Sequence, residues 1–272
     1  MTRARAFAKV NLALVVGPLR SDGKHEVVTV LQAVDLHDDV SLEAVDELEV
    51  EGFPEDTLVR GALEALADAA DVTPRWRVRI EKRIPVAAGL GGGSSDAAAA
   101  LRLANDLLPV PLSADELHVV AARIGADVPF FLRDGPQLGT GDGSELAPVE
   151  LPADYVALLV LPEGEVKEST AAVYERFDRR RGADGFELRR RVLLDALSRA
   201  ERPTDLASLP ANDLASSPLA AELMRFGAFR ADVTGAGPAV YGLFEREEQA
   251  AEAATALEGM GHTWLTRPVL RT

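Results

Sequence analysis

Residues 89–93 hold four glycines in five positions, and this run constrains the fold more than any other stretch of the chain. Glycine adopts positive φ freely and, because it lacks a Cβ, lets another group come close to the main chain. Residues 76–84 before the run alternate like a β-strand, and Ser94 or Ser95 after it can cap a helix to about Leu108. The run therefore joins a strand to a helix, either as a flexible hinge or as a loop that contacts a ligand.

A glycine loop that enters a helix N-terminus is typical of an anion site, because the first-turn amides are unpaired and the helix dipole is positive there. Two known phosphate loops do not fit. The Walker pattern needs a following Gly-Lys-Ser/Thr, and the dinucleotide pattern needs an acidic residue about 20 positions on; neither is present. Asp96 in the first turn favours the interpretation as a flexible hinge, since its carboxylate would repel a bound phosphate unless it points away from the loop. Both interpretations stay open on the loop alone.

Composition narrows the class of protein. With 272 residues, 47% apolar and 27% charged, the chain resembles globular proteins of one large or two ordinary domains. It has no cysteine, which excludes disulfides and thiolate metal sites, and its four scattered histidines form no metal-ligand pattern. A net charge of −15 argues against a nucleic-acid surface, and no run approaches the ~20 apolar residues of a membrane span. We expect a cytoplasmic protein with no nucleic-acid or membrane partner, whereas the oligomeric state stays unknown at this point.

The first residues predict a strand with two polar side chains on one face. In residues 6–16 every even position is apolar, whereas Lys9 and Asn11 share the odd face and point the same way. These two residues also interrupt the apolar run, which favours a strand over a signal peptide. Further strands are expected at 25–34, 39–50 and 76–84, and helices at 56–70, from Ser94 or Ser95 to Leu108, and from the capping box at Ser113 to Gly125.

The residues after about 150 predict a second domain. Strands are expected at 155–161, 229–234, 239–244 and 263–269, with several helices after the first and one helix at 247–257. Apart from the extra helices, this is the β-α-β-β-α-β order of a ferredoxin-like unit. The expected domains are therefore 1–150 and 151–272. A second glycine loop, residues 235–238, joins the two middle strands of the later domain.

Two charged residues add to the glycine loop. Asp127 follows a helix end and precedes Val128-Pro129, where proline favours an extended Val128 and a rigidly placed carboxylate. A lone aspartate here is more often a turn residue, and Lys9 alone could be a snorkelling lysine on an edge strand. Taken with a phosphate-binding loop, however, the lysine and the aspartate are the charge stabiliser and the base of a phosphotransferase.

At this point a resemblance becomes specific. The segments AKVNLAL, PVAAGLGGGSSDAAAAL, GADVPFFL and VTGAGPAVYGLF resemble the GHMP kinase superfamily nearly end to end. Residues 20–25, 170–174 and 211–214 are similar to the branch that phosphorylates the 2-hydroxyl of a cytidine-diphosphate alcohol. The resemblance implies an α+β, two-domain GHMP kinase fold, with an N-terminal domain like the second domain of ribosomal protein S5 and a ferredoxin-like C-terminal domain. It also implies a small-molecule nucleotide substrate and the cofactors ATP and Mg²⁺.

The same resemblance implies a role for each candidate residue. Asp127 would be the base that takes the proton of the substrate hydroxyl, and Lys9 would orient Asp127 and offset charge. The ATP-binding residues would be Gly89, Leu90, Gly91, Gly92, Gly93, Ser94 and Ser95, closed over by Gly235 and Gly237. Mg²⁺ would be held through the ATP phosphates, with Ser95 as its candidate protein contact. The substrate-binding residues would be Asn11, His25, Thr170 and Tyr174, with His25 bonding the cytosine and Tyr174 stacking on it.

The chain departs from the family pattern at two places. Lys24 stands where the family usually has a tyrosine, so one aromatic face of the expected cytosine pocket is missing. Thr57-Leu58 stands where an Asn-Leu pair usually lies near the adenine. Two alternatives remain: another GHMP kinase of the mevalonate or homoserine type, and a catalytically silent binding module of the same fold.

Overall fold

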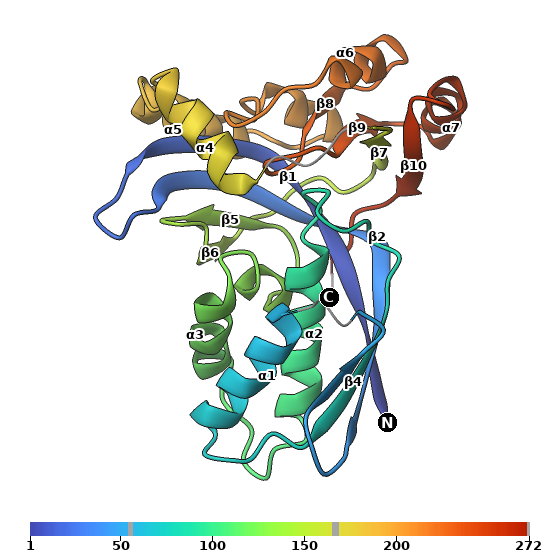
Figure 1. The fold of residues 1–272 in the computed structure, drawn as a ribbon. Coiled ribbons are helices and arrows are strands. Elements are labelled where there is room, and N and C mark those ends of the chain that lie inside the picture. Colours follow the sequence, from blue (N-terminus) through green and yellow to red (C-terminus); the bar gives the residue numbers. More distant parts are fainter. Residues whose placement is uncertain (54–56, 165–168, 271–272) are drawn as a thin grey trace.

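The computed structural model describes residues 1–53, 57–164 and 169–270. Its N-terminal half is a six-stranded sheet covered on one face by helices (Figure 1). The strands are β1 (Thr2–Leu19), β2 (His25–Ala44), β3 (Glu49–Glu51), β4 (Trp76–Glu81), β5 (Gln137–Thr140) and β6 (Glu145–Pro148). Their order is β3-β4-β2-β5-β6. Strand β1 pairs with β2 along the edge of β2 that faces away from β4 and β5. The even apolar positions of β1 are buried, but the odd positions from Lys9 to Val15 are buried as well, so burial does not follow the predicted alternation there.

The strand β2 corrects one prediction. Two strands were expected at 25–34 and 39–50, but β2 is continuous from His25 to Ala44, and only the short β3 follows. The polar stretch between the expected strands does not end β2. The pairing with β1 shifts register there instead, from Phe7 opposite His37 to Ala8 opposite Val34, so a bulge absorbs the extra residues.

Helices α1 (Thr57–Ala69), α2 (Gly92–Asn105) and α3 (Ala114–Ile124) pack their apolar faces on this sheet. The predicted capping box of α3 is confirmed: Ser113 N–H donates to Glu116 at 2.8 Å, and Gly125 is the C-cap. The predicted serine cap of α2 is wrong. Gly91, at φ 72°, is the N-cap, so Ser94 and Ser95 lie inside the first turn.

The segment after α3 also differs from its prediction. Val128 is helical, at φ −62° and ψ −44°, rather than extended, and it precedes the short 3₁₀ helix η1 (Pro129–Leu132). Proline at the first position of a helix loses no intrahelical bond, and the buried Val128 side chain packs in the core. Asp127 is therefore held between a helix end and a helical turn.

The C-terminal half is a four-stranded antiparallel sheet with the order β10-β7-β9-β8. The strands are β7 (Val156–Pro162), β8 (Arg230–Val233), β9 (Val240–Phe244) and β10 (Gly261–Thr266). Numbered by sequence within this unit, the order is 4-1-3-2, and helices α6 (Pro218–Arg225) and α7 (Glu247–Ala256) pack on the sheet, so the ferredoxin-like unit is present. The extra helices between β7 and β8 are α4 (Thr170–Arg179), α5 (Phe186–Leu197) and η2 (Pro203–Ser208).

One buried cluster belongs to both sheets. Val10 and Leu12 of β1 pack with Leu159 of β7 and with Tyr241 and Leu243 of β9. The proposed boundary between residues 150 and 151 falls between β6 and β7. Because the halves share apolar side chains, β1 carries residues of a common interface as well as of its own sheet.

Candidate active site

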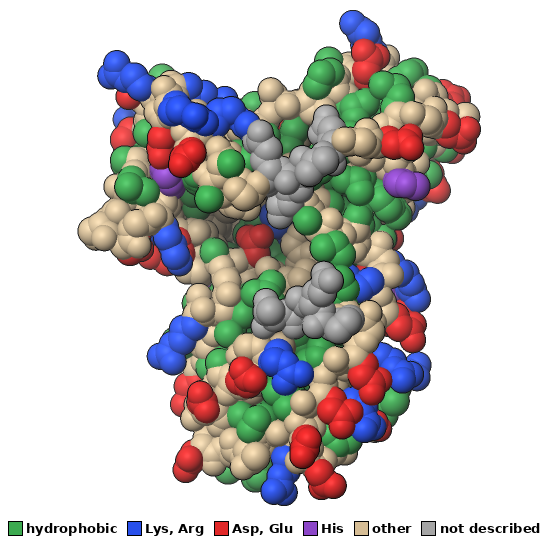
Figure 2. Space-filling view, viewed as in Figure 1, with side chains coloured by type: hydrophobic (Ala, Val, Ile, Leu, Met, Phe, Trp, Pro, Cys, Tyr) green, Lys and Arg blue, Asp and Glu red, His purple; other side chains and the backbone are tan. Residues whose placement is uncertain are grey.

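A cavity of about 580 Å³ opens between the two halves. Figure 2 shows the hollow at the waist of the molecule, with acidic side chains inside it. This volume is typical of sites for small organic ligands. The candidate residues that line it are Lys9, Asn11, Gly89, Leu90, Gly91, Gly92, Gly93, Ser94, Asp127, Thr170, Tyr174, Gly235 and Gly237. The other two candidates, Ser95 and His25, are buried behind the described lining.

The glycine loop lies between β4 and α2, and two of its glycines are required by close approaches. Gly89 has φ 86°, and a Cβ there would lie 2.4 Å from the carbonyl oxygen of Thr234. Gly91 has φ 72°, and its Cβ would lie 2.9 Å from the ring of Phe131 and 3.0 Å from Cγ of Lys9. The first turn of α2 follows the glycine loop directly, and its residues 92–94 line the cavity. The unpaired amides of a helix N-terminus favour an anion at such a place.

Lys9 and Asp127 form an ion pair at the cavity wall. The Lys9 ammonium is 3% exposed, donates to Oδ1 of Asn11 at 2.5 Å and lies 3.5 Å from Oδ2 of Asp127. The Asp127 side chain is 41% exposed, so its carboxylate can reach a ligand in the cavity. The Lys9 amide donates to the Leu90 carbonyl at 2.9 Å, which ties β1 to the glycine loop. This arrangement provides an accessible base beside a fixed positive charge.

A second lysine, Lys82, neutralises charge at the start of α2. Its ammonium donates to Asp38 at 2.5 Å and to Asp96 at 2.7 Å, and both carboxylates are fully buried. Burial opposes a charged lysine, but the two carboxylates outweigh it and raise the pKa of Lys82. Asp96 is therefore fully buried and neutralised by Lys82, a residue of the cavity lining, so its charge is no objection to an anion at the loop.

His25 and Tyr174 lie together at one end of the cavity. Tyr174 of α4 lines the cavity and stacks on His25, with ring centroids 4.8 Å apart and an interplanar angle of 27°. The buried His25 ring pairs through Nε2 with Asp178 at 2.8 Å. Burial, helped by the charge of Asp127, raises the pKa of Tyr174 to about 12, so its phenol stays protonated. Tyr174 thus covers His25 on the side facing the cavity.

Lys24, where the family pattern has an aromatic, forms an ion pair with Asp142 in the turn between β5 and β6. Lys24 is 56% exposed, whereas Asp142 is 14% exposed and lines the cavity. Burial acts to raise the pKa of Asp142, but hydrogen bonds from Lys24 and Ser144 outweigh it and lower the pKa to about 2. Sequence reasoning missed Asp142 because only the fold brings it to the cavity.

The remaining expectations concern the adenine contacts, metal ligands and membrane spans. Leu58 lines the cavity, whereas the Thr57 side chain lies outside the described residues. Within residues 1–53, 57–164 and 169–270, no group of three or more His, Asp or Glu side chains could hold a metal ion. In that same part of the chain, none of the helices is both long and apolar enough to cross a bilayer.

Comparison with known proteins gives consistent matches over both halves. The GHMP kinases N terminal domain matches residues 57–135, and the GHMP kinases C terminal domain matches residues 214–263. A protein of Kineococcus radiotolerans named 4-diphosphocytidyl-2-C-methyl-D-erythritol kinase is 39% identical, over 94% of this chain and 85% of its own length. A protein of the same name from Nocardia farcinica is 40% identical, over 94% of this chain and 89% of its own length.

Solved structures agree with these matches. A crystal structure of 4-(cytidine 5'-diphospho)-2C-methyl-D-erythritol kinase superposes with a TM-score of 0.78 at 32% identity and covers 98% of this chain and 99% of the other. A mevalonate kinase also reaches 0.78, with 99% of each chain covered, but at 16% identity, which shows the fold alone. The α+β, two-part GHMP kinase fold predicted from the sequence is therefore confirmed.

Proposed function

The chain belongs to the GHMP kinases and, within them, to the 4-diphosphocytidyl-2-C-methyl-D-erythritol kinase family, and we propose that it phosphorylates the 2-hydroxyl of that substrate with ATP. This reaction is a step of the non-mevalonate isoprenoid pathway. One observation carries the proposal: the same cavity holds the glycine loop at the α2 N-terminus and, beside it, the Lys9–Asp127 pair.

Asp127 is the proposed base. It accepts the proton of the substrate 2-hydroxyl as that oxygen bonds to the γ-phosphorus of ATP and the bond from this phosphorus to the bridging oxygen of ADP breaks. Lys9, 3.5 Å from Asp127, orients the carboxylate and offsets the charge on the transferred phosphoryl group. The 41% exposure of Asp127 supports this role, because a base must touch its substrate.

The ATP phosphates are proposed to lie on the amides of Gly89–Gly93, with Gly235 and Gly237 opposite. We expect Mg²⁺ to bind through the phosphates, because the described residues offer no acidic cluster of their own. Mg²⁺ there would neutralise charge on the phosphate oxygens. Of the two serines, Ser94 lines the cavity, whereas the buried Ser95 uses its amide on the Gly91 carbonyl. The side chain that reaches the phosphates is therefore proposed to be Ser94.

The substrate is proposed to lie along β1 and α4. Asn11 and Thr170 line the same cavity as Asp127 and would meet the methylerythritol and phosphate part. The Tyr174 ring would be the stacking surface of the cytosine subsite, and His25, which Tyr174 covers, would hold that ring in place. We propose a cytoplasmic location and a small-molecule nucleotide substrate as the binding partner, which the acidic, cysteine-free composition supports.

Two alternatives are weaker. The fold itself does not separate this kinase from a mevalonate-type kinase, since both superpose equally well. Sequence identity does separate them, at 32% against 16%. A catalytically silent binding module would not need an accessible carboxylate paired with a buried lysine.

A coupled assay of ADP release tests the proposal. The protein is supplied with ATP, Mg²⁺ and one of three alcohols: 4-diphosphocytidyl-2-C-methyl-D-erythritol, mevalonate or homoserine. We expect turnover with the first alcohol only, because it is the only one of the three with a nucleobase that can stack on Tyr174. Turnover with mevalonate or homoserine instead would replace the proposed substrate, and ADP release with none of the three would overturn the kinase assignment.

A further inference from the structure

Strand β1 has a bulge immediately after Asn11. The register with β2 runs from Asn11 opposite Leu31 to Ala13 opposite Val30, so Leu12 is the inserted residue. A bulge turns backbone groups away from the ladder, and those groups need other partners when they are buried. Leu12 is fully buried and Asn11 is 5% exposed. The Asn11 amide and the Leu12 carbonyl are the two groups in question.

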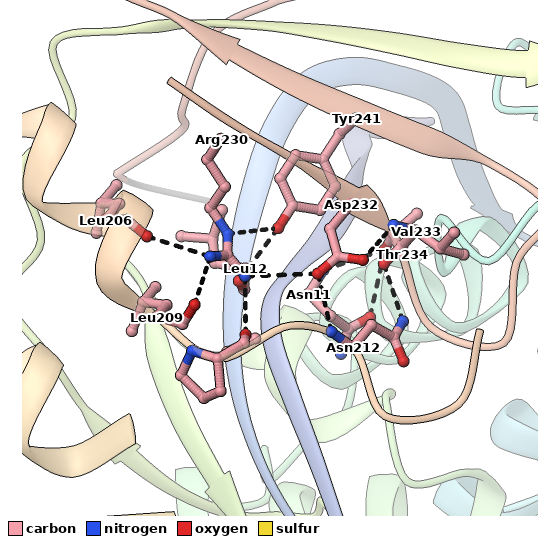
Figure 3. Close-up of polar contacts among 12 residues, drawn as sticks. Asn11, Leu12, Leu206, Leu209, Asn212, Arg230, Asp232, Val233, Thr234 and Tyr241 are labelled. Atoms are coloured by element: carbon pink, nitrogen blue, oxygen red, sulfur yellow. Dashed lines mark hydrogen bonds and ion pairs between the residues drawn. The ribbon is translucent and has the colours of Figure 1, made fainter. Parts of the chain in front are cut away.

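Both partners come from the C-terminal sheet (Figure 3). The Asn11 amide donates to the hydroxyl oxygen of Thr234 at 3.0 Å, and the Tyr241 hydroxyl donates to the Leu12 carbonyl at 3.1 Å. Thr234 follows β8 and Tyr241 lies in β9, and both are fully buried. The bulge in the strand that carries Lys9 is thus held by residues more than 200 positions later in the chain.

Thr234 also reaches the side chain that holds Lys9. Its hydroxyl lies 3.3 Å from Oδ1 of Asn11 and 3.3 Å from the Gly89 carbonyl, and it can donate its one hydrogen to either. Oδ1 of Asn11 is the atom that accepts from the Lys9 ammonium at 2.5 Å. A continuous chain of contacts therefore runs from Thr234 through Asn11 and Lys9 to Asp127.

Thr234 is itself rigidly placed. Its amide donates to the Ala239 carbonyl at 3.0 Å. On either side of it, the Asn212 side-chain amide donates to the carbonyls of Val233 at 2.9 Å and Gly235 at 2.7 Å. The Asn212 backbone amide in turn donates to Asp232 at 2.8 Å. Figure 3 shows these side chains converging on the end of β8. The hydroxyl therefore has little freedom to follow a shift of Asn11.

We propose that Thr234 is a positioning residue for phosphate transfer: its hydroxyl holds the Asn11 backbone amide and contacts the Asn11 carboxamide, and through them it positions the Lys9 ammonium beside Asp127. The inference rests on the proposed function, because the reaction that it supports is the one assigned to Asp127. Tyr241 holds the other side of the bulge through the main chain. The C-terminal sheet thus sets the geometry of a catalytic strand that belongs to the other sheet.

The test compares two Thr→Val variants, each of which replaces a buried hydroxyl with a methyl. Thr234→Val removes the contact with Asn11. Thr266→Val is the matched control, since Thr266 is 3% exposed, lies in β10 and donates to the Ala157 carbonyl at 2.9 Å. We expect Thr234→Val to lower kcat about 10-fold to 100-fold, the usual effect of a small misplacement at a reacting centre, with little change in KM for ATP. Thr266→Val should lower Tm by a similar amount but leave kcat unchanged.

Two further variants separate positioning from general damage. Thr234→Ser keeps the hydroxyl and should retain kcat within about 3-fold. Thr234→Ala removes the hydroxyl without putting a methyl in its place, and should lower kcat as much as Thr234→Val does. In an Asn11→Ala background, Thr234→Val should add little to the loss, because the two residues act as one unit. The proposal would be overturned by equal losses of kcat in Thr234→Val and Thr266→Val, or by full kcat in Thr234→Val and Thr234→Ala. It would also be overturned if the losses of Thr234→Val and Asn11→Ala were additive.

A readout without activity keeps this inference distinct from the proposed function. Amide-resolved hydrogen exchange by NMR should show faster exchange of the Asn11 amide in Thr234→Val than in the unmodified protein or in Thr266→Val. Unchanged exchange would refute the contact. If the unmodified protein releases no ADP with any of the three alcohols, the proposed function fails, and the exchange result alone decides whether Thr234 holds Asn11.

Discussion

The charge of the cavity wall depends on the pair Lys24 and Asp142. The pKa of Asp142 is about 2, so its carboxylate is ionised throughout the physiological range. It lines a cavity that we propose receives two polyphosphates, and its contact with Lys24 offsets part of the resulting repulsion. Lys24 thus has a structural reason to be a lysine, although it leaves the expected cytosine subsite without one aromatic face.

Replacing Lys24 with methionine should therefore weaken substrate binding through charge rather than stacking. We expect Lys24→Met to raise KM for the nucleotide substrate about 2-fold to 5-fold, in line with an exposed ion pair, and to leave kcat unchanged. The double variant Lys24→Met/Asp142→Asn should recover most of the loss. Steady-state kinetics at low and high salt measure this effect, because salt should reduce the penalty.

The control is Arg267→Met, which breaks an exposed ion pair with Glu247 away from the cavity and should leave KM unchanged. A lower KM in Lys24→Met would contradict this interpretation and show that the lysine obstructs the substrate.

Individual side chains could be predicted from the sequence only where a local pattern marked them. Lys9 stood out on a strand face, and Asp127 stood out between a helix end and a proline. Thr234 had no such signal, because its contact with Asn11 joins positions 223 residues apart. Lys82 had no such signal either, because its pairing with Asp38 and Asp96 depends on how β2 lies beside the loop.

Among the elements, the glycine loop and α2 carry most of the site. The sequence suggested that the glycines leave the main chain open to a ligand. The structure adds that Gly89 and Gly91 allow the loop to approach the Thr234 carbonyl and the Lys9 side chain. The helix begins earlier than a serine cap predicts, because Gly91 takes the N-cap position at positive φ. Tertiary contacts therefore decide the boundary that local propensity does not.

Adding one methyl at Gly91 tests this account of the loop. Gly91→Ala should lower the free energy of unfolding by about 1–3 kcal/mol, because alanine is strained at φ 72° and its Cβ would collide with Phe131 and Lys9. Displacement of Lys9 should also lower kcat. Urea unfolding and steady-state turnover measure the two effects.

Gly61→Ala is the control for that experiment. Gly61 lies inside α1, and a Cβ there would meet no described atom within 4 Å. This substitution should raise the free energy of unfolding by about 0.5–1 kcal/mol and leave kcat unchanged. If Gly91→Ala were as stable and active as Gly61→Ala, the close contacts at Gly91 would not matter.

At the scale of the whole molecule, the two sheets build one site between them. The N-terminal half contributes Lys9, the glycine loop and Asp127, and the C-terminal half contributes Thr170, Tyr174 and the second glycine loop. The order of elements was enough to predict a ferredoxin-like unit. How that unit lies against β1 could not be predicted without the resemblance, because the shared core of Leu12, Leu159 and Tyr241 leaves no local pattern.

Phosphate transfer in the shared cavity, as we propose it, depends on Asp127 as the base. The most direct measurement is kcat of Asp127→Asn with 4-diphosphocytidyl-2-C-methyl-D-erythritol at saturating ATP, beside the exposed control Asp154→Asn. We expect Asp127→Asn to keep its fold and its affinity for ATP but to lose about 10²-fold to 10⁴-fold in kcat, whereas Asp154→Asn should be unchanged. An Asp127→Asn variant with the turnover of the unmodified protein would contradict this proposal.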